Sequence, residues 1–420
     1  MRRLITAIAL TAAIIAGARE PHDTMDGIYN ERIRTVTLSV DGDRFAPPVA
    51  FMGLGAPVTV EFDHLSDDRV FLRYRVVRCD ANWQPSVLAE AEYLDGFNES
   101  AIEAYEYSRG TTVHYVHYGF QFPNEDISPT LSGNYLIEVY PEDDPDDVWM
   151  TRRVMLSEQS APISTSVTSR TDIDYNVGHQ QLSVAVDTER ARVADPFNDL
   201  KVMIAQNGRR DNEVMLRQPL RMSGATAVYE HSAPLIFEAG NEYRRMEVTD
   251  VNYPGMGVAD IVWADPYYHF ELMTDVPRAD QPYVYDSTQH GRFFVRRYGS
   301  ESSDTEADYV VVHFSLEMDE LPGSMVFLDG DFTSRRFDPA SLMTYNRETG
   351  RYEKVMLLKQ GHYNYQYLTV PPGARSATAA TVEGNKYPTI NEYLIKVYTR
   401  GPLDRTDRLI GVTQITSQPR

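Results

Sequence analysis

Apolar and polar residues alternate with a period of two along many short stretches of this 420-residue chain. Gly, Pro, Asn and Asp residues separate these stretches, which is typical of β-strands joined by turns. In residues 134–140, for example, Tyr135, Ile137 and Val139 are expected on one face of a strand. No long amphipathic helix is indicated, and the best helical candidate is the short segment 87–93. Strands are predicted over residues 33–40, 57–62, 70–78, 112–122, 134–140, 172–185, 202–204, 227–231, 244–251, 293–297, 309–316, 324–328, 352–358, 363–368 and 392–399.

Two changes in composition predict domain boundaries. A polar linker rich in serine follows residue 156, and Pro and Asp residues crowd together over residues 277–288. Many short strands without alternating helices favour sandwiches of antiparallel sheets. We therefore predict an all-β chain with three tandem β-sandwich domains over residues 27–157, 163–280 and 288–415. Within the third, the Ser-, Thr- and Ala-rich stretch 374–381 predicts a mobile loop.

The first eighteen residues have the pattern of a cleaved secretory signal peptide. Arg2 and Arg3 precede an apolar run over residues 4–15, and the small residues at 16–18 form a cleavage site. The run is too short to span a bilayer. Removal of residues 1–18 leaves Arg19 as the first residue of a protein outside the cytoplasm, and no cysteine near this point could carry a lipid anchor.

The net charge and the cysteine content exclude several kinds of partner and an intramolecular disulfide. The formal net charge of −21 at pH 7 repels nucleic-acid backbones and anionic lipids, so neither is an expected partner. Cys79 is the sole cysteine, so an intramolecular disulfide is impossible. It ends a predicted strand, and we expect a buried structural residue. A reactive thiol would require Arg73, Arg75 and Arg78 to converge on the sulfur.

The chain carries no motif that indicates catalysis. His114 and His117 lie in one predicted strand, where a spacing of three residues places them on opposite faces and argues against a shared metal. The acidic run 141–147 could bind calcium, but it lacks the glycine and terminal glutamate of an EF-hand loop, which favours a solvated turn. We therefore predict a protein without enzymatic activity and assign no catalytic, cofactor-binding or metal-binding residues.

Six short segments within residues 27–157 stand out, in this order: 29–33, 78–86, 92–97, 117–118, 122–125 and 132–136. Trp83 lies in the second, a polar turn with Pro85, where an indole is expected to bury against a sandwich edge. Together these segments resemble the N-terminal domain of the plug proteins of the type IX secretion system, a system of the phylum Bacteroidota.

The resemblance implies a periplasmic protein at the inner face of the outer membrane. Proteins of this family bind the translocon barrel in the outer membrane and close its periplasmic opening. A function of this kind requires a rigid folded body and no catalytic site. The implied partner is therefore the type IX translocon barrel.

In the third predicted domain, three segments stand out: residues 326–332, 352–353 and 361–367. They resemble early-set sandwich modules of the glycogen-binding type, which implies sandwich domains of immunoglobulin-like or early-set-like type. In those modules an aromatic residue shortly after the Gly-Asp-Phe segment stacks on sugar. Thr333, Ser334, Arg335 and Arg336 occupy these positions here, which does not favour carbohydrate binding. An extracytoplasmic carbohydrate-binding or polysaccharide-processing accessory protein remains the alternative function.

Overall fold

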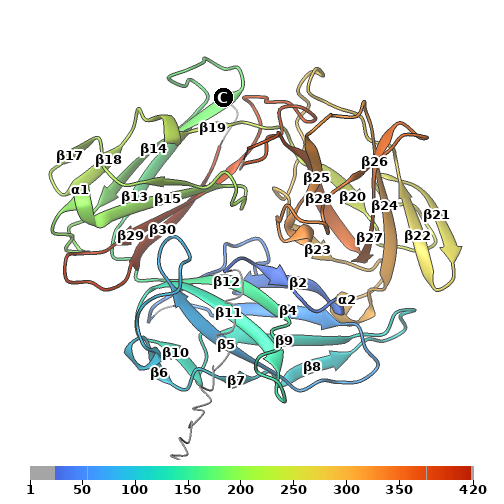
Figure 1. The fold of residues 1–420 in the computed structure, drawn as a ribbon, viewed down its shortest axis with the longest axis horizontal. Coiled ribbons are helices and arrows are strands. Elements are labelled where there is room, and N and C mark those ends of the chain that lie inside the picture. Colours follow the sequence, from blue (N-terminus) through green and yellow to red (C-terminus); the bar gives the residue numbers. More distant parts are fainter. Residues whose placement is uncertain (1–23, 54, 375, 418–420) are drawn as a thin grey trace, which may run out of the picture.

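The computed structural model describes residues 24–53, 55–374 and 376–417 (Figure 1). It confirms the predicted all-β class, with 46% of the residues in strands and 4% in helices. The sheets form three groups, each with a hydrophobic core between two sheets, and we call these groups units 1, 2 and 3. Within the described ranges, no helix is long and apolar enough to cross a membrane. The predicted signal peptide, residues 1–18, lies outside the described residues.

Unit 1 comprises residues 27–157. One of its main sheets has the strand order β1-β12-β11-β5-β7, with β3 parallel to β12, and the other has the order β2-β4-β9-β8. Val60 and Phe62 of one sheet pack on Tyr74 and Val76 of the other, and all four are buried. The strands are β1 (Gly27–Ile28), β2 (Ile33–Val40), β3 (Val49–Phe51), β4 (Val58–His64), β5 (Leu72–Cys79), β6 (Leu94–Gly96), β7 (Ser100–Ala101), β8 (Ala104–Tyr107), β9 (Val116–Phe122), β10 (Ile127–Pro129), β11 (Gly133–Pro141) and β12 (Met150–Ser157).

Unit 2 is built from two distant parts of the chain, residues 163–238 and 392–416. Its sheets have the orders β13-β14-β18-β17, with β19 beside β14, and β16-β15-β29-β30. Val184 of the first sheet and Ile204 and Ile395 of the second share one core. The elements are β13 (Ile163–Thr168), β14 (His179–Asp187), α1 (Pro196–Asp199), β15 (Leu200–Gln206), β16 (Val214–Leu216), β17 (Arg221–Ser223), β18 (Thr226–Tyr229), β19 (Ile236–Glu238), β29 (Glu392–Thr399) and β30 (Arg408–Thr416).

Unit 3 comprises residues 244–370. Its sheets have the orders β20-β28-β23, with β25 beside β28, and β21-β22-β24-β27-β26. Tyr363 and Leu328 of the first sheet pack on Val312 of the second. The elements are β20 (Arg244–Glu247), β21 (Val258–Ala264), β22 (Tyr267–Leu272), β23 (Phe293–Val295), α2 (Ser303–Glu306), β24 (Tyr309–Glu317), β25 (Met325–Asp329), β26 (Thr344–Asn346), β27 (Arg351–Lys359) and β28 (Gly361–Val370).

The sheets do not follow the predicted boundaries of the second and third domains, 163–280 and 288–415. Residues 244–272 pair within unit 3, whereas β29 and β30, drawn in red in Figure 1, continue the sheet of β15 in unit 2. Lys201 of β15 lies opposite Tyr398 of β29. A period of two shows where a strand is but not which strand it pairs with, and this explains the difference.

The structure also describes three shorter segments that carry local predictions. The helical candidate 87–93 contains only a short 3-10 turn, Glu90–Glu92. Every residue of β11 is buried, because Tyr135 faces the core of unit 1 while Leu136 faces unit 2. Within the stretch predicted as a mobile loop, residues 377–379 pack against unit 3: Ala377 and Ala379 are buried, and Thr378 pairs with Thr369.

Candidate functional site at the junction of the three units

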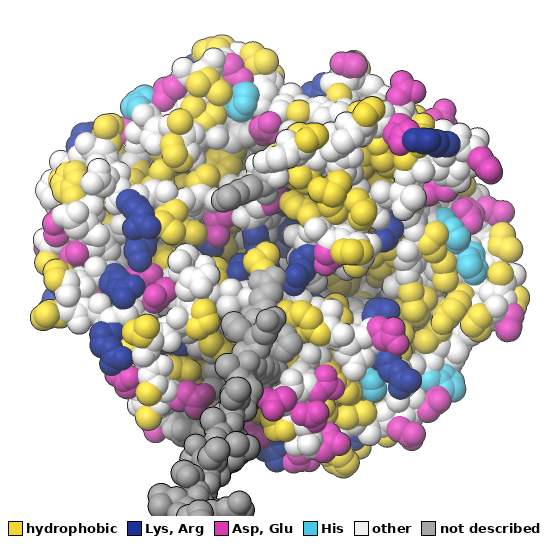
Figure 2. All heavy atoms as spheres, viewed as in Figure 1, with side chains coloured by type: hydrophobic (Ala, Val, Ile, Leu, Met, Phe, Trp, Pro, Cys, Tyr) yellow, Lys and Arg dark blue, Asp and Glu magenta, His cyan; other side chains and the backbone are white. Residues whose placement is uncertain are grey.

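The three units meet around a cavity of about 220 Å³, which we call the central cavity. Figure 2 shows Lys and Arg side chains in the hollow between the units. Unit 1 contributes positions on β2 and β12, unit 2 contributes β29 and the turn after β15, and unit 3 contributes the start of β23 and the turn after β25. The charged side chains of the lining are Arg44, Arg152, Arg153, Arg209, Arg210, Arg292, Arg335 and Lys396, with Asp26, Glu213, Asp331 and Glu392.

Backbone turns bring two of these arginines to the junction from unit 2. Asn207 and Gly208 both have positive φ values, of 51° and 71°, which turn the chain sharply after β15. The Asn207 amide stabilises the turn, since its Nδ2 donates to Asn391 Oδ1 at 2.7 Å and its Oδ1 accepts from the Glu392 backbone at 2.8 Å. Arg209 and Arg210 follow immediately.

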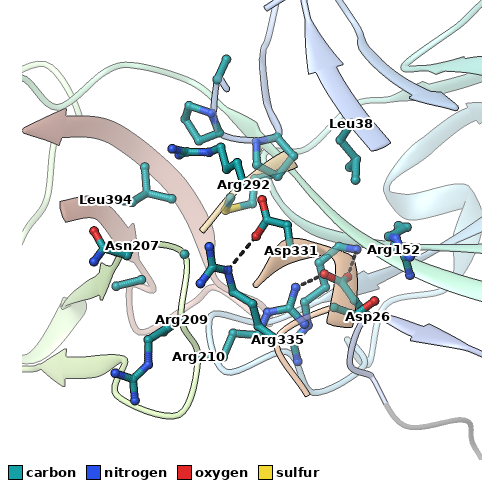
Figure 3. Close-up of a pocket in the computed structure, with 18 of the residues that line it drawn as sticks. Asp26, Leu38, Arg152, Asn207, Arg209, Arg210, Arg292, Asp331, Arg335 and Leu394 are labelled. Carbon is teal, nitrogen blue, oxygen red and sulfur yellow. Dashed lines mark hydrogen bonds and ion pairs between the residues drawn. The ribbon is translucent and has the colours of Figure 1, made fainter. Parts of the chain in front are cut away.

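Arg335 enters the junction from unit 3. Its guanidinium donates to Asp331 Oδ1 at 2.6 Å (Figure 3). It also donates to the His290 carbonyl at 2.8 Å. Arg335 occupies the segment where glycogen-binding modules place a stacking aromatic residue, and here it is buried within the protein. This position therefore offers no exposed platform for a sugar ring.

Burial makes the positive charges of this cavity costly. Burial, and to a lesser extent the nearby Arg336, lowers the pKa of Arg152 and that of Arg210 to about 10 each. Arg210 forms an ion pair with Asp26, which directly precedes β1 of unit 1, so one contact already connects unit 2 with the start of unit 1. Figure 3 shows this pair beside Arg152 and Arg335.

A second polar cluster, the Asp63 cluster, joins units 1 and 3. Asp63 and Lys359 are both buried, and Lys359 Nζ lies 2.5 Å from Asp63 Oδ2. Asp63 also accepts from Tyr309 Oη at 2.6 Å and contacts His117 Nδ1 at 2.7 Å. Tyr309 Oη in turn lies 2.6 Å from Thr35 Oγ1. Side chains from β4, β9, β24 and β27 thus satisfy one buried carboxylate.

Contacts within the Asp63 cluster determine the protonation states of Asp63 and His117. Burial by itself would raise the pKa of Asp63, but Lys359 and His117 together hold it below the usual value. Burial likewise opposes protonation of His117, but its hydrogen bonds to Asp63 and Glu61 prevail and raise its pKa to about 9. His117 is therefore a cation at neutral pH, which balances the carboxylate together with Lys359.

Apolar side chains join units 1 and 2, in what we call the apolar joint. Cys79, Trp83 and Leu136 of unit 1 pack in one buried cluster with Tyr398 and Leu409 of unit 2. Arg78 extends this contact by donating to the Asp407 carbonyl at 2.7 Å, and Tyr398 Oη donates to Asn134 Oδ1 at 2.7 Å. The predictions that Cys79 and Trp83 are buried are confirmed, and burial raises the pKa of the Cys79 thiol to about 12.

The other residues considered from the sequence lie apart from one another. His114 is exposed and contacts Asp67 at 2.6 Å, whereas His117 belongs to the Asp63 cluster. Residues 142–147 form an exposed turn after β11. Among the described residues, no group of His, Cys, Asp and Glu side chains has an arrangement that could hold a metal ion. The sequence analysis did not identify the central cavity or Lys359, because their partners lie far apart along the chain.

The fold thus defines a class: all-β proteins of several antiparallel two-sheet units packed around a basic junction. Residues 33–158 match the family model described as "Type 9 secretion system plug protein 1st domain". A crystal structure of a hypothetical protein from Parabacteroides merdae is similar at a TM-score of 0.92 and 42% identity, over 94% of this chain and 99% of that chain. No curated protein matches. The chain belongs to the same family as the Parabacteroides merdae protein, and residues 33–158 belong to the type IX plug first-domain family.

Proposed function

We propose that the protein is a non-catalytic periplasmic plug of the type IX secretion translocon, which binds the outer-membrane barrel and closes its periplasmic opening. The observation that carries this proposal is the family match over residues 33–158. The signal-peptide pattern of residues 1–18 supports export from the cytoplasm. The alternative of carbohydrate binding gains no support, since Arg335 is buried where the stacking aromatic would lie.

The packing of the units supports a rigid blocking body. Domains within a chain usually move relative to one another unless their interface is large and hydrophobic. Here the buried side chains of the apolar joint connect units 1 and 2, and the buried ion pair of the Asp63 cluster connects units 1 and 3. A body fixed in this way can obstruct an opening without closing around a substrate.

We further propose that the three units are sandwich domains of immunoglobulin-like or early-set-like type, with unit 3 inserted into unit 2. The insertion lies between β19 and β29, so unit 2 provides both the entry to unit 3 and the exit from it. Limited proteolysis tests this division. The first cuts should fall in exposed segments between strands and release unit 3 only after two cleavages.

A deletion strain tests the plug function. Loss of the protein should leave an open conduit and increase the entry of large, normally excluded antibiotics or dyes, and the wild-type gene should restore exclusion. Tagged protein should also co-purify a barrel from detergent-solubilised outer membranes. Unchanged permeability together with the absence of any co-purified barrel would contradict the proposal.

Charge substitutions on exposed apolar residues can identify the docking unit. Phe97 of unit 1, Tyr175 of unit 2 and Trp263 of unit 3 are 86%, 62% and 48% exposed. A stable complex depends on a few apolar anchors, so a glutamate at an anchor should reduce barrel capture at least tenfold. Arg217→Gln, at an exposed position, is the matched control and should leave capture unchanged.

A further inference from the structure

The plug proposal makes no use of the central cavity, although the cavity collects cationic side chains from all three units. The protein as a whole is strongly acidic, with a net charge of −21. Against that background, arginines from β12, from the turn after β15 and from the turn after β25 line one cavity (Figure 3). Only cations that the protein does not itself neutralise are available to bind an anionic ligand.

Most of the arginines have a carboxylate partner. Arg209 binds Asp211 at 2.6 Å, Arg292 binds Glu392 at 2.7 Å, and Arg335 binds Asp331 at 2.6 Å. These pairs are part of the wall and bring no net charge to a ligand. The capacity to bind an anion must come from the remaining arginines.

The available donors are on Arg152 and on Arg210, which keeps one buried nitrogen without a partner beside its ion pair with Asp26. Arg152 is 5% exposed and donates only to the carbonyls of Gly27 and Thr151, at 3.1 and 2.8 Å; no carboxylate of the described residues lies within 4 Å of it. Arg210 shares its Nη2 with Asp26, while its Nη1 is buried without a hydrogen-bond partner in the described part of the chain. A buried donor without an acceptor is costly and marks a position where an acceptor would be stabilising.

The rest of the lining determines the shape of a matching ligand. Val36, Leu38, Pro47 and Pro48 of unit 1 and Leu394 of unit 2 form an apolar wall beside the arginines. A small inorganic ion would leave this wall in contact with water. A ligand with an apolar body and an anionic group would cover the wall and bring its oxygens to the guanidinium groups.

We propose that the central cavity is a binding site for a small organic oxyanion, a phosphate ester or a carboxylate on an apolar body, held by Arg152 and Arg210. Guanidinium groups present paired N–H donors that match the oxygens of both anions. Such a ligand would contact side chains of all three units and stabilise their relative placement. This inference goes beyond the plug function and does not depend on it.

Calorimetry on the full mature chain tests the proposal, with phenyl phosphate and benzoate as the two probes, inorganic phosphate for the anion alone and phenol for the apolar body alone. At least one aromatic anion should bind and raise the melting temperature in a concentration-dependent manner. Phenol should not bind. The stronger of the two aromatic anions identifies the chemistry of the anionic group.

Two variants at one ion pair should change the affinity in opposite directions. Arg210→Gln removes a donor and should weaken binding about tenfold, which corresponds to roughly 1.4 kcal/mol. Asp26→Asn removes the competing carboxylate and should strengthen binding, while its Oδ1 can still accept from the Arg153 backbone, a 2.6 Å contact. Arg217→Gln on the surface is the matched control and should bind as the wild type does.

The order Asp26→Asn, wild type, Arg210→Gln in decreasing affinity would support the site. Equal affinity in all three, binding of phenol as strong as that of the anions, or no binding of either aromatic anion would overturn it. If Arg210→Gln does not fold, the affinity of Asp26→Asn relative to wild type still decides the question. None of these results bears on barrel capture, so the two proposals fail separately.

Discussion

The contacts of unit 1 with its two neighbours differ in chemistry. The apolar joint with unit 2 packs Cys79, Trp83 and Leu136 against Tyr398 and Leu409. The contact with unit 3 centres on the buried pair of Asp63 and Lys359. Apolar packing is non-directional and stabilises many orientations, whereas a buried carboxylate requires its partners in particular places.

The difference indicates separate roles for the two contacts. Moving two charges out of water costs several kcal/mol per ion, and a buried pair often returns little net stability. Asp63 nevertheless has Lys359 and Tyr309 on one carboxylate oxygen and His117 on the other, so both oxygens have a partner. We infer that the apolar joint provides affinity between units, while the Asp63 cluster specifies how unit 3 is oriented on unit 1.

Removing one charge of the Asp63 cluster should produce the largest loss of stability. Lys359→Met leaves Asp63 with one cation fewer in a buried site and should lower the free energy of unfolding by about 3–5 kcal/mol. Urea denaturation measures the loss. The double variant Lys359→Met with Asp63→Asn is the control, since it removes both charges and should recover much of the stability. A loss below about 1 kcal/mol in the single variant would contradict the role given to the pair.

A cavity in the apolar joint should lower the free energy of unfolding somewhat less than Lys359→Met does. The size of this loss should not depend on pH. Leu136→Ala removes a buried side chain and should lower the free energy of unfolding by about 2–4 kcal/mol. The loss should be the same at pH 6 and pH 9, because burial raises the pKa values of Cys79 and Tyr398, the titratable side chains of the joint, above this range. Val87→Ala, at a position that is 70% exposed, is the control and should have little effect. A strongly pH-dependent loss for Leu136→Ala would argue against the contrast between the two contacts.

The Asp63 cluster should weaken in alkaline solution. The pKa of His117 is about 9 in the folded protein, above the ordinary value of 6.5, so its stabilisation is complete below about pH 6.5 and disappears as the pH rises through 9. The shift corresponds to at most about 3 kcal/mol. Melting temperatures from pH 6 to pH 10 should therefore fall more for the wild type than for His117→Gln. Parallel curves for the two proteins would show that His117 does not titrate as described.

The rate at which the Cys79 thiol is alkylated should report on the apolar joint. In the native state the thiol should hardly react. This thiol is buried, with a pKa of about 12, so the reactive thiolate is scarce at pH 8. An alkylating reagent should modify it only as fast as unit 1 separates from unit 2 or unfolds. Mass spectrometry should find negligible labelling without denaturant and complete labelling in denaturant. Rapid native labelling would place the thiol at an open surface.

Sequence patterns predicted many of the strands and some single buried residues, but missed others, such as β30, and did not show the pairing between units. The strand Ile33–Val40 and the burial of Cys79 and Trp83 follow from local alternation and turn chemistry. Lys359 was not anticipated, because a lysine at the end of an apolar run normally reaches solvent and Asp63 lies on a distant strand. The turn at Asn207 and Gly208 has a recognisable turn composition, yet nothing in it shows that Arg210 meets Asp26.

The insertion of unit 3 between β19 and β29 affects the order in which the chain can fold during synthesis and export. Half of the sheet β16-β15-β29-β30 comes from residues 392–416, so unit 2 cannot complete its core until nearly all of the chain has emerged. Units 1 and 3 contain all their strands earlier. A nonsense mutation shortly before Glu392 would therefore leave every strand of unit 3 in place, although unit 3 is nearer to the mutation in sequence. Unit 2 would lose β29 and β30, and the open edge of its sheet would be prone to aggregation.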